Sequence, residues 1–429
     1  MAEVTTGVLL FAISLATAGI AGAQTVDPLE GVIVREVNVV GLRNLPAEFV
    51  ERHLSTRPGE PFHRAAVERD RRRLDELRVF SSVTIAPRLD RDAVVVDITV
   101  AETFRVLPVV VFRVTDENGL SAGPGVKVID LLGQGEQVGA QTRFGGETAF
   151  AVTIDSTTIT PTTVAWHGGF SDTHRRNTVF DFDEHAMTAD VRVSRNLAHG
   201  LRFGVAGDLT MLDSGTSGAS LSADGTDVIP TVGGFLSLDT LDSSTDPRIG
   251  TWAEVQVDHL FGDANSWTLT LDGRRFQRLN RRHGVGVFGL ATLQSGEVGV
   301  GLPTYLQFAL GGGNSVRGWD LDSRRGRNQF IASVEYTFVA QPVTPFSVSG
   351  FNFYAGVQVV GFADLGLAWN SSDDFDTSAA IDGYGVGVRF LVPFVDVIRI
   401  DVAWGQPGRG AIGYFGVSLK AARQRQRVR

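Results

Sequence analysis

Short runs that alternate apolar with polar or glycine positions fill the chain from about residue 104 onward. The clearest are Gly284–Leu290, Gly383–Phe390 and Ile398–Trp404. In Gly383–Phe390 the even positions are apolar, and the odd positions carry Gly385, Gly387 and Arg389. Successive side chains of a strand point to opposite faces, so this period of two predicts strands with one apolar and one polar face. Clusters of Asp, Asn, Gly, Ser and Thr separate the runs and predict turns.

Two architectures fit such strands, a soluble β-sandwich and a membrane barrel. The barrel is favoured because the polar face carries full charges and many glycines, as a water-filled lumen allows. About 325 residues of this pattern would also make a very large soluble β domain. At about 20 residues per strand and connection, the region predicts an all-β transmembrane antiparallel β-barrel of about 16 strands, an even number as in bacterial barrels.

Residues 31–103 follow a different pattern. Apolar positions at helical spacing mark two helices, which follow one strand and precede two more in the order β-α-α-β-β. The expected elements are Ile33–Val40, Ala47–Ser55, Phe62–Arg78, Phe80–Ile85 and Ala93–Val100. They predict a small α+β domain. The charged run Glu68–Arg73 fits a nucleic-acid or headgroup contact, or the solvated face of the second helix; the helix face is preferred because no aromatic residues accompany the arginines.

The chain begins with an apolar run of small residues, Gly7 to Gly22, which ends at Ala21-Gly22-Ala23. This is the shape of a secretory signal with a small-x-small cleavage site. A membrane anchor is the alternative, but about 16 residues fall short of the roughly 20 that span a bilayer. We therefore expect a signal peptide over 1–23, although no Lys or Arg precedes the run, and a linker over 24–30.

Composition excludes several classes of function. The chain has no cysteine, hence no disulfide framework or thiolate metal site, and its net charge of −9 argues against nucleic-acid binding. The eight histidines are scattered, and neither an H-E-x-x-H nor a G-x-S-x-G motif occurs. We expect no enzymatic activity, no catalytic residue, no metal site and no cofactor.

The segment GGGNSVRGWD combines three glycines, Gly311, Gly312 and Gly313, with the unit Val316, Arg317, Gly318 and Trp319. It is not a phosphate loop, because no Lys-Ser/Thr pair follows and the flanks are not strand and helix. Two blocks come after it, IASVEYTF (Ile331 to Phe338) and GFADLGLAW (Gly361 to Trp369). In these blocks the period of two places Glu335 and Asp364 opposite the apolar face, on the lumen side of a barrel.

These features resemble the BamA/TamA-like superfamily of outer-membrane β-barrel assembly and translocation proteins, the surface-antigen barrels. The likeness rests on the Val-Arg-Gly-aromatic unit, the two blocks after it, LLGQGEQVGAQTRFGG (Leu131 to Gly146), TDPRIG (Thr245 to Gly250), and a 31–103 segment similar to a polypeptide-transport-associated (POTRA) domain. The resemblance implies a long loop that folds back into the lumen. It also implies that Arg317 pairs there with Glu335 and Asp364, a contact that we call the latch, with the glycines as slack in the loop.

The resemblance further implies that the chain inserts or assembles β-barrel proteins in a bacterial-type outer membrane. Its partners would be unfolded outer-membrane protein clients, outer-membrane lipid, and periplasmic chaperones or accessory subunits. The expected domains are a periplasmic POTRA-like domain over 31–103, an integral barrel over 104–420 and a basic tail over 421–429. A polypeptide translocase of the two-partner-secretion type and a passive porin or structural barrel remain the alternatives, as does a soluble binding protein.

Overall fold

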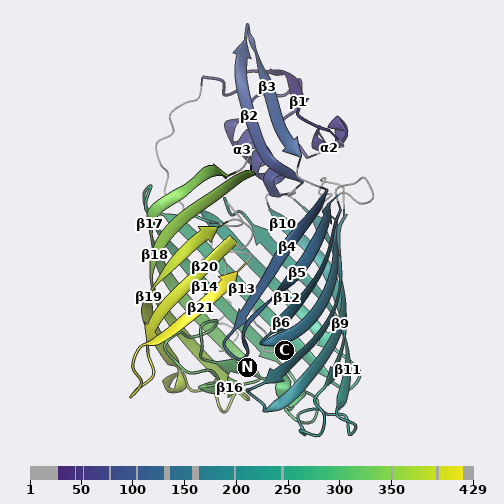
Figure 1. Ribbon diagram of the computed structural model, residues 1–429, viewed down its shortest axis with the longest axis vertical. Helices are drawn as coiled ribbons and strands as arrows, with labels where there is room; N and C mark the ends of the chain where they lie inside the picture. Colours follow the sequence, from purple (N-terminus) through teal and green to yellow (C-terminus); the bar gives the residue numbers. More distant parts are fainter. Residues whose placement is uncertain are drawn as a thin grey trace.

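The computed structural model has a small N-terminal domain that stands over one rim of a large β-barrel (Figure 1). It describes residues 28–418 except 44, 52, 77–78, 103–104, 130–135, 157–163, 198–199, 243–245, 349–350 and 393–395. The expected signal peptide over 1–23, most of the 24–30 linker and the basic tail over 421–429 lie outside the described residues.

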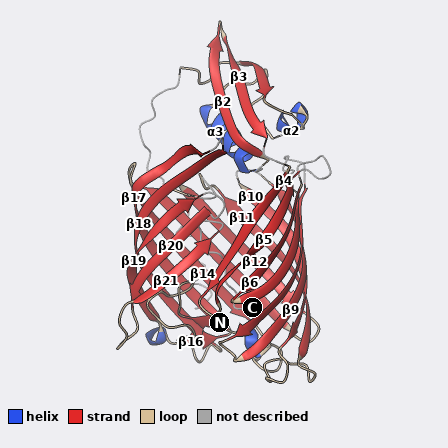
Figure 2. Ribbon diagram, viewed as in Figure 1, coloured by secondary structure: helices blue, strands red, loops and turns tan. Residues whose placement is uncertain are grey.

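The N-terminal domain consists of a three-stranded sheet with two helices against it (Figure 2). Its elements are β1 (Val34–Val40), α2 (Ala47–Glu51), α3 (Arg64–Glu76), β2 (Phe80–Asp90) and β3 (Ala93–Glu102). β3 lies in the centre, parallel to β1 and antiparallel to β2. Apolar side chains of both helices, including Phe49 and Leu74, pack on the sheet together with Phe62, which precedes α3, and exclude water.

Within the charged run of α3, Asp70 is buried rather than solvated. Its carboxylate accepts hydrogen bonds from the backbone N–H groups of Ser55 and Thr56, at 2.7 and 2.9 Å. Glu68 and Arg71 on the same helix are more exposed and pair with each other at 3.3 Å. The run is thus mainly the outer face of a helix, with one carboxylate that fixes the chain between the two helices.

In the described part of the chain, sixteen antiparallel strands form one sheet that curls into a barrel. They are β4 (Val106–Thr115), β5 (Gly119–Ile129), β6 (Gln137–Gly145), β7 (Glu147–Asp155), β8 (Val164–Asn177), β9 (Phe182–Asn196), β10 (Leu201–Asp213), β11 (Thr226–Asp239), β12 (Gly250–Leu260), β13 (Ser266–Arg278), β14 (His283–Gln294), β17 (Asn328–Val348), β18 (Phe351–Trp369), β19 (Ile381–Val392), β20 (Asp396–Trp404) and β21 (Ile412–Ser418). The all-β barrel of about 16 strands, preceded by a small α+β domain, is confirmed.

Four short elements lie outside the barrel sheet. They are η1 (Thr304–Leu306), β15 (Phe308–Leu310), β16 (Arg324–Gly326) and η2 (Thr377–Ala379). β15 and β16 pair with each other and form the base of the segment between them. Among the described residues, no helix has the length and apolar character to cross a membrane.

The two faces of the barrel wall differ in chemistry as the period of two predicts. Large apolar side chains face outward and are exposed, among them Val205, Val232 and Tyr384. The alternate positions face the lumen and include buried charged residues such as Glu254, Asp258 and Asp272. A wall that is apolar outside and charged inside suits a barrel in lipid around an aqueous lumen.

The barrel closes at a seam between its first and last strands, β4 and β21. The hydrogen-bonded strand order runs from β21 to β4 and ends there, so no ladder joins these two strands in the described residues. They nevertheless lie side by side (Figure 1). β21 has 7 residues and β4 has 10, against 21 in β17 and 19 in β18.

Candidate functional site

The segment between β15 and β16, residues 311–323, which we call the lumen loop, turns into the barrel interior. Val316 and Arg317 at its tip are fully buried. Val316 packs with Leu310 and with Ile381 of β19. The tip is therefore held among side chains of the barrel wall and not in solvent.

Arg317 meets carboxylates from two neighbouring strands, β17 and β18. Its Nε and Nη2 atoms donate to Oδ2 and Oδ1 of Asp364 at 2.7 and 2.9 Å, which is a bidentate pair. Its Nη2 lies 2.8 Å from Oε1 of Glu335. The backbone N–H of Arg317 also donates to Asp364, at 3.1 Å. A planar guanidinium matches this arrangement, and a lysine ammonium would not.

A third carboxylate, Asp401 of β20, completes the site. Its Oδ2 lies 3.2 Å from Nη1 of Arg317, and its side chain is almost fully buried. Arg389 of β19 pairs with Asp401 and lies 3.8 Å from Glu335. Two arginines thus face three carboxylates. Arg317 comes from the lumen loop, and the other four charged residues lie on four consecutive strands of the wall.

An aromatic ring covers the guanidinium from one side. The Cζ atom of Arg317 stands 3.3 Å from the centre of the Phe362 ring, as in a cation–π contact. The Ser333 hydroxyl donates to Oδ1 of Asp364 at 2.6 Å and so occupies a further lone pair of that carboxylate. Because the charges are out of water and bonded on several sides, loss of one partner leaves the others buried and uncompensated.

The residues beside Arg317 fit the loop against the wall. Gly318 has φ of +95°, and a Cβ atom there would lie 2.5 Å from the carbonyl of Trp404. The ring N–H of Trp319 donates to the Asp382 carbonyl at 2.6 Å. On the wall, a Cβ on Gly383 would lie 1.8 Å from the carbonyl oxygen of Arg317. Glycine is needed on both sides of this contact because the two backbones touch.

The three glycines that begin the lumen loop are buried, and their backbone groups are hydrogen-bonded. This differs from the expectation that they serve as slack in the loop. Gly311 and Gly312 have φ of +114° and +84°, a region that side chains disfavour. The N–H of Gly311 donates to the Ser315 hydroxyl at 2.8 Å, and that of Gly312 to the Trp319 carbonyl at 2.9 Å. The glycines therefore form a tight turn that aims the tip at the wall.

The lumen loop also contacts both sides of the seam. The N–H of Gly313 donates to Oδ2 of Asp116, in the turn after β4, at 2.8 Å. The Tyr414 hydroxyl of β21 accepts from the N–H of Gly318 at 2.9 Å and donates to the Trp319 carbonyl at 3.1 Å. Asn314 bonds Arg399 of β20. We call Asp116, Tyr414 and Arg399 the seam contacts.

The structure brings together the residues that sequence reasoning grouped, Arg317 with Glu335 and Asp364. Sequence reasoning missed Asp401, Arg389 and the seam contacts. A signal existed for the first two, since the period of two already places both on the polar face of their strands. Asp116 and Tyr414 gave no such signal, because a turn residue and one tyrosine do not reveal a loop that approaches them.

Comparisons with known proteins agree with this architecture. The Omp85 superfamily domain matches residues 130–417, and the POTRA family described as surface antigen variable number repeat matches residues 32–103. No curated protein sequence matches the chain.

Solved structures of two kinds share the fold. The crystal structure of BamA from Haemophilus ducreyi lacking POTRA domains 1–3 is 13% identical, with a TM-score of 0.60 over 90% of this chain and 84% of that chain. CdiB from Escherichia coli is 15% identical, with a TM-score of 0.58 over 91% and 76%. CdiB from Acinetobacter baumannii is 11% identical, with a TM-score of 0.56 over 90% and 74%.

The outer wall of the barrel is apolar, its lumen is charged and holds an inserted loop, and a family match covers most of the barrel. The chain therefore belongs to the Omp85 superfamily and is an outer-membrane β-barrel protein with a POTRA domain.

Proposed function

We propose that this protein inserts or assembles other β-barrel proteins in the outer membrane, with its POTRA domain in the periplasm. The observation that carries the proposal is the seam. Two short strands lie side by side without a hydrogen-bonded ladder in the described residues, and a buried loop contacts both sides of the gap. Unpaired strand edges are templates on which another strand can pair.

β4 and β21 would supply those edges to a client. β4 contains Pro108, which lacks an N–H and is typical of edge strands. The energetic cost of parting β4 from β21 is small, because no backbone ladder joins them in the described residues. A client strand that paired with either edge would satisfy backbone groups that otherwise have no partner in lipid.

The POTRA domain offers a second edge, on which an unfolded client would first bind. β2 lies at one edge of its three-stranded sheet. β1 lies at the other edge, but residues 59–62 already pair with the start of β1. β2 is the freer of the two, and Pro87 within it again suits an edge. Capture by strand addition uses backbone hydrogen bonds, so it tolerates many client sequences.

The latch has a structural role in this scheme. Arg317, with Glu335, Asp364 and Asp401, fixes the tip of the lumen loop, and the fixed loop places the seam contacts. Loss of the latch would therefore alter the seam without touching any residue of β4. Protein assembly of this kind makes or breaks no covalent bond, and we assign no catalytic residue.

Depletion of the protein from its own cells, followed by quantification of the outer-membrane proteome, tests the proposal. We expect a broad fall in β-barrel proteins, restored by the wild-type chain and restored less well by Arg317→Ala. Loss of one secreted product with barrel proteins unchanged would indicate a translocase instead. An unchanged proteome, with solute conductance in bilayers, would indicate a porin.

A further inference from the structure

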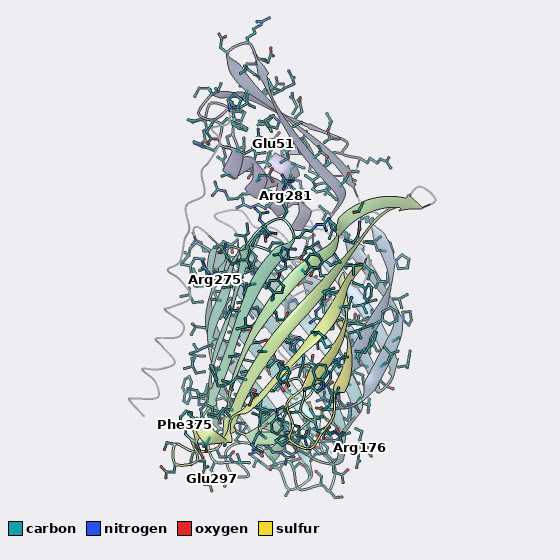
Figure 3. All side chains as sticks on the ribbon, turned by 90° about the vertical axis from the view of Figure 1, so that its left-hand side faces the viewer. Glu51, Arg176, Arg275, Arg281, Glu297 and Phe375 are labelled. Atoms are coloured by element: carbon teal, nitrogen blue, oxygen red, sulfur yellow. The ribbon has the colours of Figure 1, made fainter. Side chains whose placement is uncertain are left out.

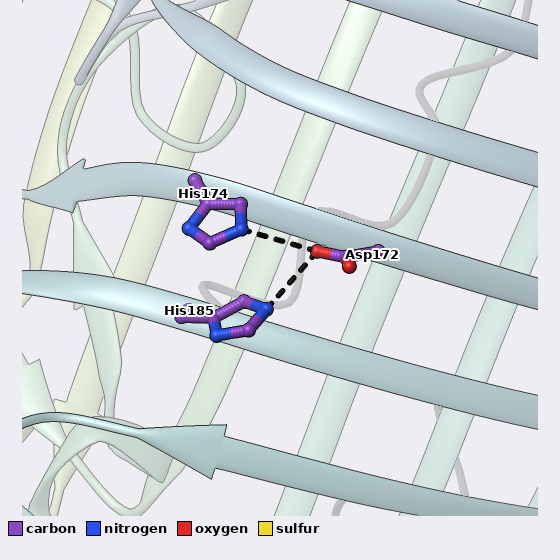
Figure 4. Close-up of side chains that lie close together, drawn as sticks. All are labelled: Asp172, His174 and His185. Carbon is purple, nitrogen blue, oxygen red and sulfur yellow. Dashed lines mark hydrogen bonds and ion pairs between the residues drawn. The ribbon is translucent and has the colours of Figure 1, made fainter.

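Two histidines and an aspartate outside the latch converge on one point of the barrel wall. Asp172 and His174 lie on β8, and His185 is directly opposite His174 on β9. The two imidazole rings stack with centroids 3.8 Å apart and planes 13° from parallel. Both Nε2 atoms face the same carboxylate oxygen, Oδ1 of Asp172, at 3.4 and 3.1 Å (Figure 4).

The cluster lies on the outer face of the barrel, toward the rim away from the POTRA domain. Ser171, Thr173 and Arg175, the alternate positions of β8, line a lumen cavity, so Asp172 and His174 point outward. Trp166 and Phe170, which share their face, are exposed. Arg176, two residues beyond His174, marks this rim in Figure 3.

The spacing of these ligand atoms fits a small coordination polyhedron. Zn²⁺ binds imidazole nitrogen and carboxylate oxygen at about 2.0–2.2 Å, so two ligand atoms of a tetrahedral site are about 3.3–3.6 Å apart. Of the two observed nitrogen-to-oxygen distances, 3.4 Å lies within this range and 3.1 Å is slightly shorter. All three ligand atoms lie within 4.8 Å of one another. To bind one cation, the two rings would tilt out of their parallel stack so that the lone pair of each Nε2 atom points at the ion.

His167, on the same strand as His174, has contacts that differ from those expected of a metal-binding histidine. His167 of β8 contacts Asp155 through Nδ1 at 2.7 Å and Asp190 through Nε2 at 3.1 Å. Its carboxylates lie on opposite sides of the ring, so no single ion could bind both carboxylates and the imidazole. At His174 and His185, by contrast, the same nitrogen of each ring turns to one shared point.

The charge around the cluster favours a cation over a phosphate. Asp181 and Asp183 lie in or beside the adjoining turn and both pair with Arg176. Asp213 of β10 is the strand partner of His185 and is exposed. With Asp172, four carboxylates stand near one arginine. An anion would be repelled from this surface unless the histidines were charged.

We propose that Asp172, His174 and His185 form a binding site for one divalent first-row transition cation, with water in the remaining positions. Two imidazoles and a carboxylate without thiolate suit Zn²⁺ and its neighbours in the series, rather than Ca²⁺ or Mg²⁺, which take oxygen ligands. The ion would link β8 to β9 close to the turn that joins them. Sequence reasoning expected no metal site, because His174 and His185 come together only when the hairpin forms.

Zinc titration of the full chain in detergent micelles, without a histidine tag, tests the site. Isothermal titration calorimetry should find one Zn²⁺ per chain. His174→Ala and His185→Ala should each weaken binding at least about tenfold, because loss of even a group that only orients a ligand costs about 10–100-fold. Co²⁺ offered in place of Zn²⁺ should give an intense visible absorption band in the wild type, which the double variant His174→Ala/His185→Ala lacks.

Two further variants make the result interpretable. Asp172→Asn keeps the size of the side chain and should also weaken binding. His283→Ala removes an exposed histidine on β14 that contacts the Tyr336 hydroxyl, and should bind Zn²⁺ as the wild type does. The proposal is overturned if the wild type binds no Zn²⁺, or if the double variant, shown by circular dichroism to be folded, binds it as tightly as the wild type.

Discussion

Arg317 concentrates polar contacts at one buried point of the molecule. All three of its guanidinium nitrogens face carboxylates, and its exposed fraction is 0%. Such a residue stabilises the fold only as part of a complete set. The complete group of ion pairs contributes only modestly to the free energy of unfolding. Removal of one member lowers that free energy strongly, because the remaining charges stay buried without a partner.

Arg317→Ala should therefore reduce stability strongly, by about 3–5 kcal/mol as for other broken buried ion pairs. Arg317→Lys should recover only part of this loss, since an ammonium cannot make the bidentate pair with Asp364. Thermal unfolding in detergent, read from heat-modifiable gel migration, measures the change. Arg176→Ala is the matched control: its ion pairs are exposed, so the expected loss is below about 1 kcal/mol. Equal losses in the two variants would contradict the latch.

Gly318→Ala tests the close approach of the loop to the wall. The new Cβ would lie 2.5 Å from backbone atoms of Trp404, and φ of +95° is strained for alanine. The strain alone costs about 1–2 kcal/mol, and the clash adds to it. We expect faster protease cleavage between residues 311 and 328. Gly361→Ala, on the neighbouring wall with no atom within 4 Å of the new Cβ, should leave cleavage unchanged.

Residue by residue, the site was only partly predictable from the sequence. Glu335 and Asp364 sit in strands whose apolar positions alternate without interruption, so their face could be read from the period of two. The same rule places Asp401 and Arg389 on the lumen face but does not reveal which loop reaches them. The ring of Phe362 under Arg317 could not be foreseen, because side-chain stacking depends on the register between β18 and the loop.

At the level of elements, the seam differs from every other strand junction of the barrel. In the described part of the chain, neighbouring strands elsewhere share a hydrogen-bonded ladder, as β18 does with β19. At the seam the lumen loop hydrogen-bonds to both sides, through Asp116 in the turn after β4 and through Tyr414 of β21. The sequence did not reveal this bridge, because it joins residues far apart in the chain: Asp116 and Gly313 are 197 positions apart, and Tyr414 and Gly318 are 96 apart.

The double variant Asp116→Ala/Tyr414→Phe should loosen the seam while the latch stays intact. It leaves the N–H groups of Gly313 and Gly318 without their partners. Each buried N–H group that loses its acceptor lowers stability by about 1–3 kcal/mol. Hydrogen–deuterium exchange should accelerate in β4 and β21 and stay unchanged in β12 and β13. Tyr305→Phe, which removes a buried hydroxyl bonded to Asp227 at 2.7 Å, is the control. Exchange in β4 that is no faster than in this control would count against the bridge.

At the scale of the whole molecule, the outer surface is the property that most separates this chain from a soluble protein. Exposed apolar side chains alternate with buried charged ones around the barrel, and both sets come from the same strands. This is why the strand count and the barrel were predictable: every strand repeats the same two-residue rule. The orientation of the POTRA domain over one rim follows no such repeat, and only the structure gives it (Figure 1).

Val232→Arg tests which face meets lipid. Val232 lies near the middle of β11 and is 59% exposed on the outer face. A charge there should cost about 2–4 kcal/mol if it meets hydrocarbon at the midplane of the bilayer. We expect less protein in the membrane fraction and slower refolding into lipid vesicles. Thr210→Arg, which points into a lumen cavity, should fold almost as the wild type does. Normal refolding of Val232→Arg would argue against a lipid-facing β11.

The position of the seam contacts along the barrel has a mechanical consequence. Asp116 follows the end of β4 that is remote from the POTRA domain, and Tyr414 is the third residue of β21, which begins at the same remote side. The hydrogen bonds that the lumen loop makes to the two sides of the seam therefore lie near this remote end. A force applied near the POTRA domain would act on the part of the seam that the loop does not bridge. β4 and β21 would therefore separate first at the end near the POTRA domain.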